Sequence, residues 1–204
     1  MNNNFYKNKA ENGGVLYFGN ENDSQNSIIE KREITLNNNK FMNNEAKYFG
    51  GVIYSELEKI NLFKEENNSI INNKAGINGG GIYISKLDNI NSFNFTSSEM
   101  LNNTSNGINE DYAAKPSYVL LDTTIEDNKL SIYSGEYLSL TLSLYDAYDK
   151  FMNDITNYYS TLSLTISLKE KEPSYHNSTI NEKIEYKLTE NIVSLSRGKK
   201  KHYK

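Results

Sequence analysis

The sequence predicts an all-β protein in which coils of a parallel β-helix, residues 1–115, are followed by a small antiparallel β-sandwich, residues 117–196. Three observations predict this fold. A repeat recurs in register in the first part, the composition changes near Pro116, and apolar and polar residues alternate strictly after it. Residues 197–204 are expected to form a basic tail.

Each copy of the repeat joins a large apolar residue and an Asn three positions later to a Gly-Gly pair that precedes a short apolar strand. The three good copies are Phe5-Tyr6-Lys7-Asn8-Lys9-Ala10 with Gly13-Gly14-Val15-Leu16-Tyr17, Phe41-Met42-Asn43-Asn44-Glu45-Ala46 with Gly50-Gly51-Val52-Ile53-Tyr54, and Ile70-Ile71-Asn72-Asn73-Lys74-Ala75 with Gly79-Gly80-Gly81-Ile82-Tyr83. A fourth, decayed copy lacks the Gly-Gly pair: Met100-Leu101-Asn102-Asn103-Thr104-Ser105. The Asn positions 8, 44, 73 and 103 are 36, 29 and 30 residues apart, which predicts a solenoid.

The residue types of the repeat suit stacked coils. Gly-Gly gives the chain backbone conformations that are closed to other residues, so it can turn sharply. Asn tolerates the left-handed region and can bond the turn backbone, and Asn at one position of successive coils can form an amide ladder. We expect three stacks along the axis, namely large apolar residues pointing inward (Phe5, Phe41, Ile70, Met100), Ala in the tight inner corner (Ala10, Ala46, Ala75) and the ladder (Asn8, Asn44, Asn73, Asn103).

A helical solenoid is the main competing repeat architecture. It needs apolar residues at helical spacing over ten or more residues, and Gly-Gly and Asn-Asn in the good copies work against it. Between the copies, Ser27–Leu36 is interpreted as a further strand of a coil. Residues Glu56–Glu66 are left open as a helical or loop excursion.

The paired elements resemble those of a known family. Phe5–Asn8 and Phe41–Asn44, followed by Gly-Gly and a short apolar run, resemble the repeats of polymorphic outer membrane proteins and related surface proteins with right-handed parallel β-helices. The chain departs from that pattern at Ile70 in place of Phe, in having Val or Gly after Gly-Gly where the family favours Ala, and in lacking Cys. The resemblance implies an extracellular or cell-surface location and a role in display, adhesion or structure.

The second part has its own composition. Residues 1–110 hold 26 of the 32 Asn, and residues 111–204 hold 6. Strict alternation at Leu138–Leu144 and Leu162–Leu168 predicts strands with one wet face. Further candidate strands are Tyr118–Leu121, Leu130–Tyr133, Lys183–Leu188 and Ile192–Leu195. The stretch Ser134–Leu138 followed by Leu144–Asp149 is similar to immunoglobulin-like modules, which implies an Ig-like sandwich.

Composition disfavours several classes of function. The net charge of −4 gives no electrostatic reason to bind nucleic acid. The absence of Cys removes disulfides, thiol nucleophiles and Cys-ligated metals. No stretch approaches the roughly 18 apolar residues of a membrane-spanning helix. The one basic run, Lys199–Lys201 with Lys204, is expected to be a solvated terminus or truncation point.

No catalytic residue, cofactor site or metal site is predicted. Polysaccharide lyases need an acidic cluster for Ca²⁺ and a basic residue, and glycoside hydrolases need paired carboxylates. Asp23, Asp88, Asp111 and Arg32 are isolated instead, and His176 and His202 are expected to be solvated. Two groups are interpreted as turn-forming acids, with Ca²⁺ binding as the alternative: Asp122, Glu126 and Asp127, and Asp146 and Asp149.

These observations favour a non-catalytic surface or secreted protein with a structural or adhesive role, whose partners are cell-surface glycans or other surface proteins. The first alternative is a carbohydrate-binding or carbohydrate-active, pectate-lyase-like β-helix. The second is a gene fragment without independent function, because the first repeat begins at Phe5 with nothing before it to cap the solenoid. Candidate sugar-stacking rings are Tyr145, Tyr148, Tyr158 and Tyr159, and glycosylation sequons begin at Asn22, Asn67, Asn94, Asn102, Asn103 and Asn177.

Overall fold

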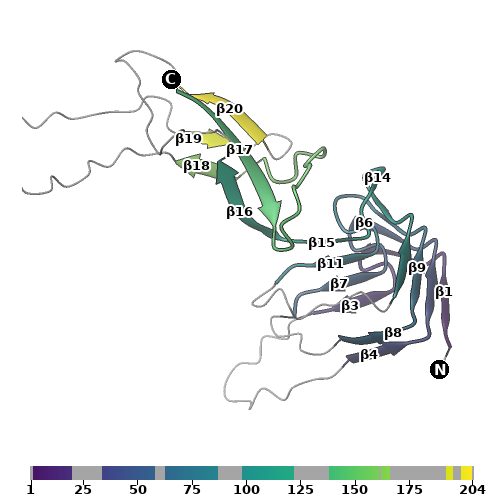
Figure 1. The fold of residues 1–204 in the computed structure, drawn as a ribbon. Coiled ribbons are helices and arrows are strands. Elements are labelled where there is room, and N and C mark those ends of the chain that lie inside the picture. Colours follow the sequence, from purple (N-terminus) through teal and green to yellow (C-terminus); the bar gives the residue numbers. More distant parts are fainter. Residues whose placement is uncertain are drawn as a thin grey trace, which may run out of the picture.

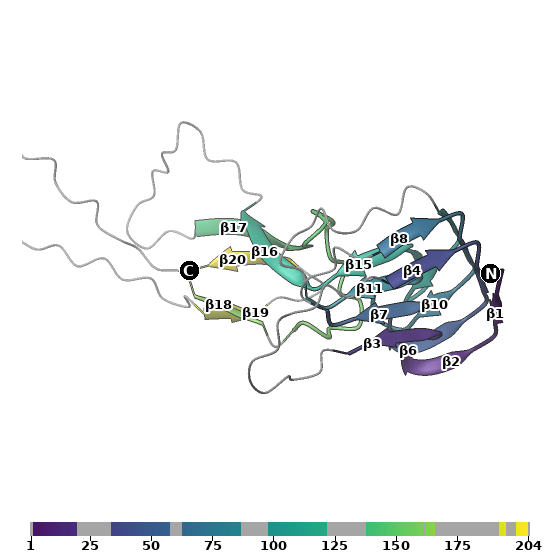
Figure 2. The ribbon, with the colours of Figure 1, turned by 90° about the horizontal axis from the view of Figure 1, so that it is seen from below.

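The computed structural model describes residues 2–19, 34–57, 63–86, 98–121, 138–160, 162–165, 192–194 and 199–203. The regular secondary structure among these residues is β-strand, with no helix in the described part of the chain. Their parallel sheets stack into a β-helix-like solenoid, and antiparallel strands lie beyond one end of it (Figure 1, Figure 2). The all-β class and the parallel repeat are therefore as predicted.

Three parallel sheets run along the solenoid, and each coil adds one strand to each sheet. The first sheet has the order β1 (Asn4–Tyr6), β5 (Lys40–Met42), β9 (Ser69–Ile71), β12 (Glu99–Leu101). The second contains β2 (Lys9–Asn12), β6 (Glu45–Phe49), β10 (Lys74–Ala75) and β13 (Thr104–Ser105), with β14 (Ile108–Asn109) antiparallel to β13. The third has the order β3 (Leu16–Phe18), β7 (Ile53–Ser55), β11 (Ile82–Ile84), β15 (Tyr112–Ala114).

The strand register brings equivalent repeat positions onto one another. Phe41 pairs with Phe5 on one side and with Ile70 on the other, and Ile70 pairs with Met100. The side chains of Phe41 and Ile70 are fully buried, and the ring of Phe5 stacks on Phe41 with centroids 4.9 Å apart. The alanines also pair in register and are buried in the inner coils, as at Ala46. One unit cannot bury this face alone, so the apolar core exists only because the coils stack.

The two glycines of each pair have different tasks. Gly50 has φ of +66°, a left-handed conformation that costs other residues energy. Gly51 instead lies where the coils approach most closely, and a Cβ there would overlap the carbonyl oxygen of Gly80 in the next coil. The first position therefore needs Gly for the turn, and the second needs it for the packing of backbone on backbone.

Two neighbouring positions of the repeat, both usually Asn, have different roles: one forms the left-handed turn and the next forms the ladder. The left-handed residue is the one before the ladder position, with φ of 56° at Asn43, Asn72 and Asn102. Lys7 occupies that place in the first coil with φ of 55°. The sequence interpretation assigned the turn and the ladder to the same Asn, whereas the structure places them on consecutive residues.

A short fourth sheet contains strands from the segments between the repeat copies. β4 (Ile34–Asn37) pairs in parallel with β8 (Phe63–Glu66). The end of Ser27–Leu36 is therefore a strand, as interpreted. Within Glu56–Glu66, β8 is a further coil strand and not a helix, because it pairs with the equivalent segment one coil earlier.

Antiparallel strands follow the solenoid. β16 (Pro116–Leu121), β17 (Leu138–Asp146) and β20 (Lys199–Tyr203) form one sheet in that order, and β18 (Ser163–Thr165) pairs with β19 (Ile192–Ser194). The basic run expected as a solvated tail thus forms strand β20 beside β17. Leu130–Tyr133 and Lys183–Leu188 lie outside the described residues, and the Ig-like sandwich stays a prediction.

Candidate functional site

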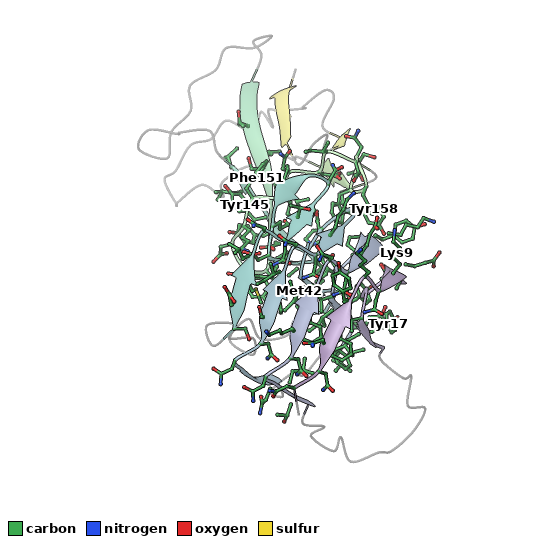
Figure 3. All side chains as sticks on the ribbon, turned by 90° about the vertical axis from the view of Figure 1, so that its right-hand side faces the viewer. Lys9, Tyr17, Met42, Tyr145, Phe151 and Tyr158 are labelled. Carbon is green, nitrogen blue, oxygen red and sulfur yellow. The ribbon has the colours of Figure 1, made fainter. Side chains whose placement is uncertain are left out.

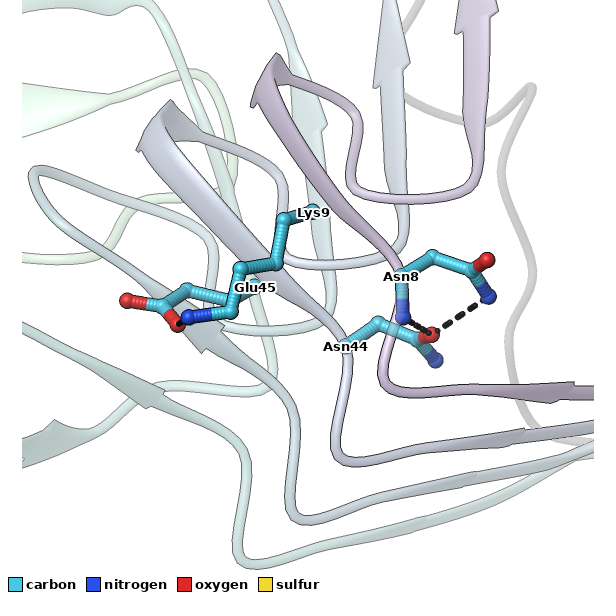
Figure 4. Close-up of polar contacts among 4 residues, drawn as sticks. All are labelled: Asn8, Lys9, Asn44 and Glu45. Carbon is cyan, nitrogen blue, oxygen red and sulfur yellow. Dashed lines mark hydrogen bonds and ion pairs between the residues drawn. The ribbon is translucent and has the colours of Figure 1, made fainter.

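The predicted ladder positions meet in a continuous row of buried amides. Oδ1 of Asn44 accepts the backbone N–H of Asn8 at 3.0 Å and its Nδ2 at 2.9 Å, as Figure 4 shows. Asn73 and Asn103 repeat the same pair of contacts in the following coils. Nδ2 of each of the three later ladder asparagines also donates to a backbone carbonyl of the preceding coil. The acceptor is the large apolar residue of that coil's repeat, as when Asn44 donates to Phe5 at 3.1 Å. The hydrogen bonds expected of this ladder are therefore present.

A second ladder lies five residues earlier in each coil and was not predicted. Oδ1 of Asn39 accepts Nδ2 of Asn3 at 3.0 Å, and Oδ1 of Asn68 accepts Nδ2 of Asn39 at 3.2 Å. Ser98 takes the place of Asn in the last coil. The signal was present in the sequence as an Asn five residues before the first three ladder positions. Two rows of amide hydrogen bonds thus join each coil to the next, and the asparagines in these rows have a structural role.

The outward face of the third sheet carries a row of tyrosines. Tyr54 stacks on Tyr17 with ring centroids 5.3 Å apart and on Tyr83 with centroids 5.8 Å apart. They face outward because the residues before and after each Tyr in its strand point into the core, such as Ile53 and Ser55 beside Tyr54. We call Tyr17, Tyr54 and Tyr83 the tyrosine row.

One end of the row is covered by the segment after β17. The hydroxyl groups of Tyr83 and Tyr159 lie 3.1 Å apart, and Phe49 lies against Tyr83 with centroids 4.5 Å apart. Burial, followed by the neighbouring phenol, raises the pKa of Tyr83 far above its ordinary value, and burial raises that of Tyr159 to about 12. Tyr158 packs edge-on against Phe49 and stays 52% exposed.

The other end of the row is open. Tyr17 is 54% exposed, and the hydroxyl of Tyr54 donates to Oε1 of Glu56 at 3.2 Å. Partial burial and then a hydrogen bond with Glu56 raise the pKa of Tyr17. An exposed ring beside a carboxylate can stack on an apolar ligand face while the carboxylate accepts hydroxyl hydrogens. Figure 3 shows Tyr17 and Tyr158 on the same side of the molecule, with Tyr145 and Phe151 on the other.

The four tyrosines suggested by the sequence as sugar-stacking rings lie in three places. Tyr158 and Tyr159 adjoin the tyrosine row. Tyr145 stacks on Tyr118, and Tyr148 packs edge-on against Tyr112 at the end of the solenoid. Sequence alone missed Tyr17, Tyr54 and Tyr83 as a surface, although their common position after Gly-Gly was a usable signal.

Asp146 is a turn-forming residue of the scaffold, as interpreted. It is buried, and its Oδ1 accepts the backbone N–H groups of Tyr148 and Lys150 at 2.8 and 3.0 Å. Its Oδ2 accepts the N–H of Ala114 at 3.0 Å, which joins the turn to the last coil. Asp149 lies in the same turn, with φ of 58°, and its Oδ1 accepts the hydroxyl of Tyr118 at 2.9 Å.

Other candidate positions serve the scaffold or lie outside the described residues. Asn103 is completely buried within its ladder and cannot accept a glycan in the folded protein, whereas the sequon residues Asn67 and Asn102 are exposed. Asp111 accepts Nδ2 of Asn103 at 2.7 Å. Candidates outside the described residues are Asp23, Arg32, Asp88, Asp122, Glu126, Asp127 and His176, and the sequons at Asn22, Asn94 and Asn177. In the part of the chain that the structure describes, no three His, Cys, Asp or Glu gather as a metal site would require.

Comparison with protein-family models, curated proteins and solved structures found no match to this chain. The described residues contain no helix with the length and apolar character needed to span a bilayer.

Proposed function

We propose that the chain is a non-catalytic structural and adhesive solenoid module of a surface or secreted protein. One observation carries the proposal: the recurring polar side chains bond coil to coil, while the side chains that recur on the outward face of the third sheet are aromatic rings. The buried ladders of Asn44 and Asn73 make a rigid scaffold, and Tyr17 and Tyr158 present exposed rings on one side of it. The resemblance of the repeats to those of polymorphic outer membrane proteins supports the same role and location. The similarity of Ser134–Leu138 and Leu144–Asp149 to immunoglobulin-like modules supports an Ig-like sandwich over residues 117–196.

Adhesion is tested with beads that carry the full chain and are applied to a cell monolayer under washing. We expect Tyr17→Ala and Tyr158→Ala each to reduce bead retention at least fivefold. Tyr6→Ala is the matched control, because Tyr6 is 56% exposed but belongs to the first sheet. Equal retention of all variants would contradict adhesion through this face, and depolymerisation of polygalacturonate at about 1 s⁻¹ or faster would contradict a non-catalytic role.

A carbohydrate ligand is the second candidate, favoured by the exposed ring of Tyr17 beside Glu56. Tyr and carboxylate side chains together offer stacking and hydroxyl recognition. On a glycan array, the full chain should give discrete signals that Tyr17→Ala and Glu56→Gln remove and Tyr6→Ala leaves. A flat array together with bead retention that resists glycosidase treatment of the cells would assign adhesion to protein partners.

A further inference from the structure

The two ends of the solenoid differ in how their strand edges are covered. At the last coil, β14 pairs with the edge of β13, and the ladder ends where Asn103 donates to Asp111. Asp146 accepts the N–H of Ala114 in β15, and Tyr148 packs against the core. Two of the three parallel sheets therefore have their last edge occupied by segments of this chain.

At the first coil, β1, β2 and β3 are each the outer strand of their sheet, with no described strand beside them. The ring of Phe5 stacks on Phe41 through one face. The N–H and Nδ2 of Asn8 both donate to Oδ1 of Asn44, and no described residue donates to Oδ1 of Asn8. Figure 4 shows this oxygen on the side away from Asn44. The edge thus offers an aromatic face, an amide acceptor and the outer backbone edges of three strands.

The direction of the hydrogen bonds along the ladder determines which kind of partner can bind this edge. At every inner step, the Asn of one coil gives its N–H and Nδ2 to Oδ1 of the next, so Oδ1 of Asn8 lacks an Asn on its open side. Every later ladder Asn also donates Nδ2 to the carbonyl of an apolar residue in the preceding coil, as Asn73 does to Phe41 at 3.0 Å. Asn8 therefore needs a partner with an apolar residue three positions before an Asn.

We propose that the open edge of the first coil binds one further coil of the same repeat type, parallel to β1, β2 and β3. Its recognition elements are a large apolar residue to stack on Phe5, an Asn three positions later to donate to Asn8, and a Gly-Gly pair to pack on Gly14. A Cβ at Gly14 would overlap the carbonyl oxygen of Gly51, which shows how closely coils must approach at this corner. This inference is independent of the proposed adhesive function.

A second folded copy of the chain does not supply this partner. The edge with matching polarity on such a copy is the last coil, where β14 and Asp146 already occupy two sheets. Two first coils placed face to face would oppose one Asn8 oxygen to another, acceptor against acceptor. The occupant is therefore an extended segment that forms its coil on the edge.

The proposal is tested by titrating the full chain into a fluorescein-labelled peptide with the sequence of residues 34–57 and recording fluorescence anisotropy. We expect saturable binding that Asn44→Ala or Phe41→Asp in the peptide weakens at least tenfold. Lys47→Ala in the peptide is the matched control, because Lys47 is exposed in its coil, and it should leave the Kd within twofold. These variants do not alter the folding of the protein partner.

On the protein side, Asn8→Ala should weaken peptide binding at least fivefold, while Asn102→Ala at the opposite end should not, with circular dichroism checking that both variants fold. Absence of saturable binding at millimolar peptide would overturn the proposal. So would equal affinity for the Asn44→Ala peptide, or self-association of the chain without peptide that Asn8→Ala abolishes, since that would assign the edge to a second copy.

Discussion

Oδ1 of Asn73 accepts two hydrogen bonds from Asn44, one from its backbone N–H and one from its side-chain Nδ2, both at 2.9 Å. One oxygen thereby satisfies a buried backbone donor at the corner of a coil and fixes the rotamer of the neighbouring amide. Because Asn73 in turn donates to Asn103, the coils are joined by one polar chain inside the core.

Replacing Asn73 by Ala is expected to lower the free energy of unfolding by about 2–4 kcal/mol, because the buried N–H of Asn44 loses its acceptor. The carbonyl of Phe41 and Oδ1 of Asn103 each lose the donor Nδ2 of Asn73 as well. Urea unfolding followed by circular dichroism measures the change. Asn8→Ala is the control at the exposed end of the ladder and should cost about 1 kcal/mol or less. Equal losses of unfolding free energy from the two substitutions would show that burial does not increase the contribution of a ladder asparagine to stability.

Gly51→Ala is expected to cost about 3 kcal/mol, because the added Cβ meets backbone atoms of Gly80 and Lys74 that belong to the next coil. Gly107→Ala is the comparison, since Gly107 has φ of +78° but nothing within 4 Å of an added Cβ. It should cost only about 1 kcal/mol, the penalty of the left-handed backbone. Thermal denaturation of both variants separates the two reasons for glycine.

Lys7→Asn is expected to raise the free energy of unfolding by about 0.5–1 kcal/mol. Lys7 has φ of 55°, and the equivalent residues of the other coils, such as Asn43, are Asn. Asn enters the left-handed region at lower cost because its short side chain can bond the local backbone. The reverse change, Asn43→Lys, should lower stability by a similar amount in the same denaturation assay.

Glu110 should make the protein more stable as the pH falls toward the ordinary pKa of a glutamate. Burial raises the pKa of its carboxyl in the folded state, against the opposing hydrogen bonds from Ser105 and the Gly79 backbone. The folded state then binds more protons than the unfolded state between the two pKa values, so stability declines as the pH rises through this window. Glu110→Gln keeps an oxygen acceptor for Gly79 and should flatten this part of the pH profile of the unfolding midpoint. An unchanged profile would contradict the assignment to Glu110.

Tyr148→Phe is expected to stabilise the chain by about 1 kcal/mol. The hydroxyl of Tyr148 is buried at the last coil with no hydrogen-bond partner among the described residues, and an unsatisfied buried hydroxyl costs free energy. Tyr118→Phe serves as the control, because that hydroxyl donates to Asp149 at the surface and its loss should be neutral or slightly destabilising. Destabilisation by Tyr148→Phe would show that its hydroxyl is bonded in solution.

The sequence by itself determined the coils and their first ladder. Phe41, Asn44 and Gly51 recur at matching places because each coil must satisfy the same local demands, so a repeat of residue types predicts a repeat of structure. The second ladder through Asn39 was readable in the same way, but its Asn stood among adjacent Asn residues that obscured the register.

Tertiary structure alone decided which surfaces are covered and where strands find partners. Tyr83 and Tyr17 hold equivalent repeat positions, yet the segment after β17 covers only Tyr83. Asp146 meets Ala114 across 32 residues, and the basic run of β20 pairs with β17 across more than 50. Such contacts depend on packing between segments that share no repeat and no local pattern, and this is why the sequence could not place them.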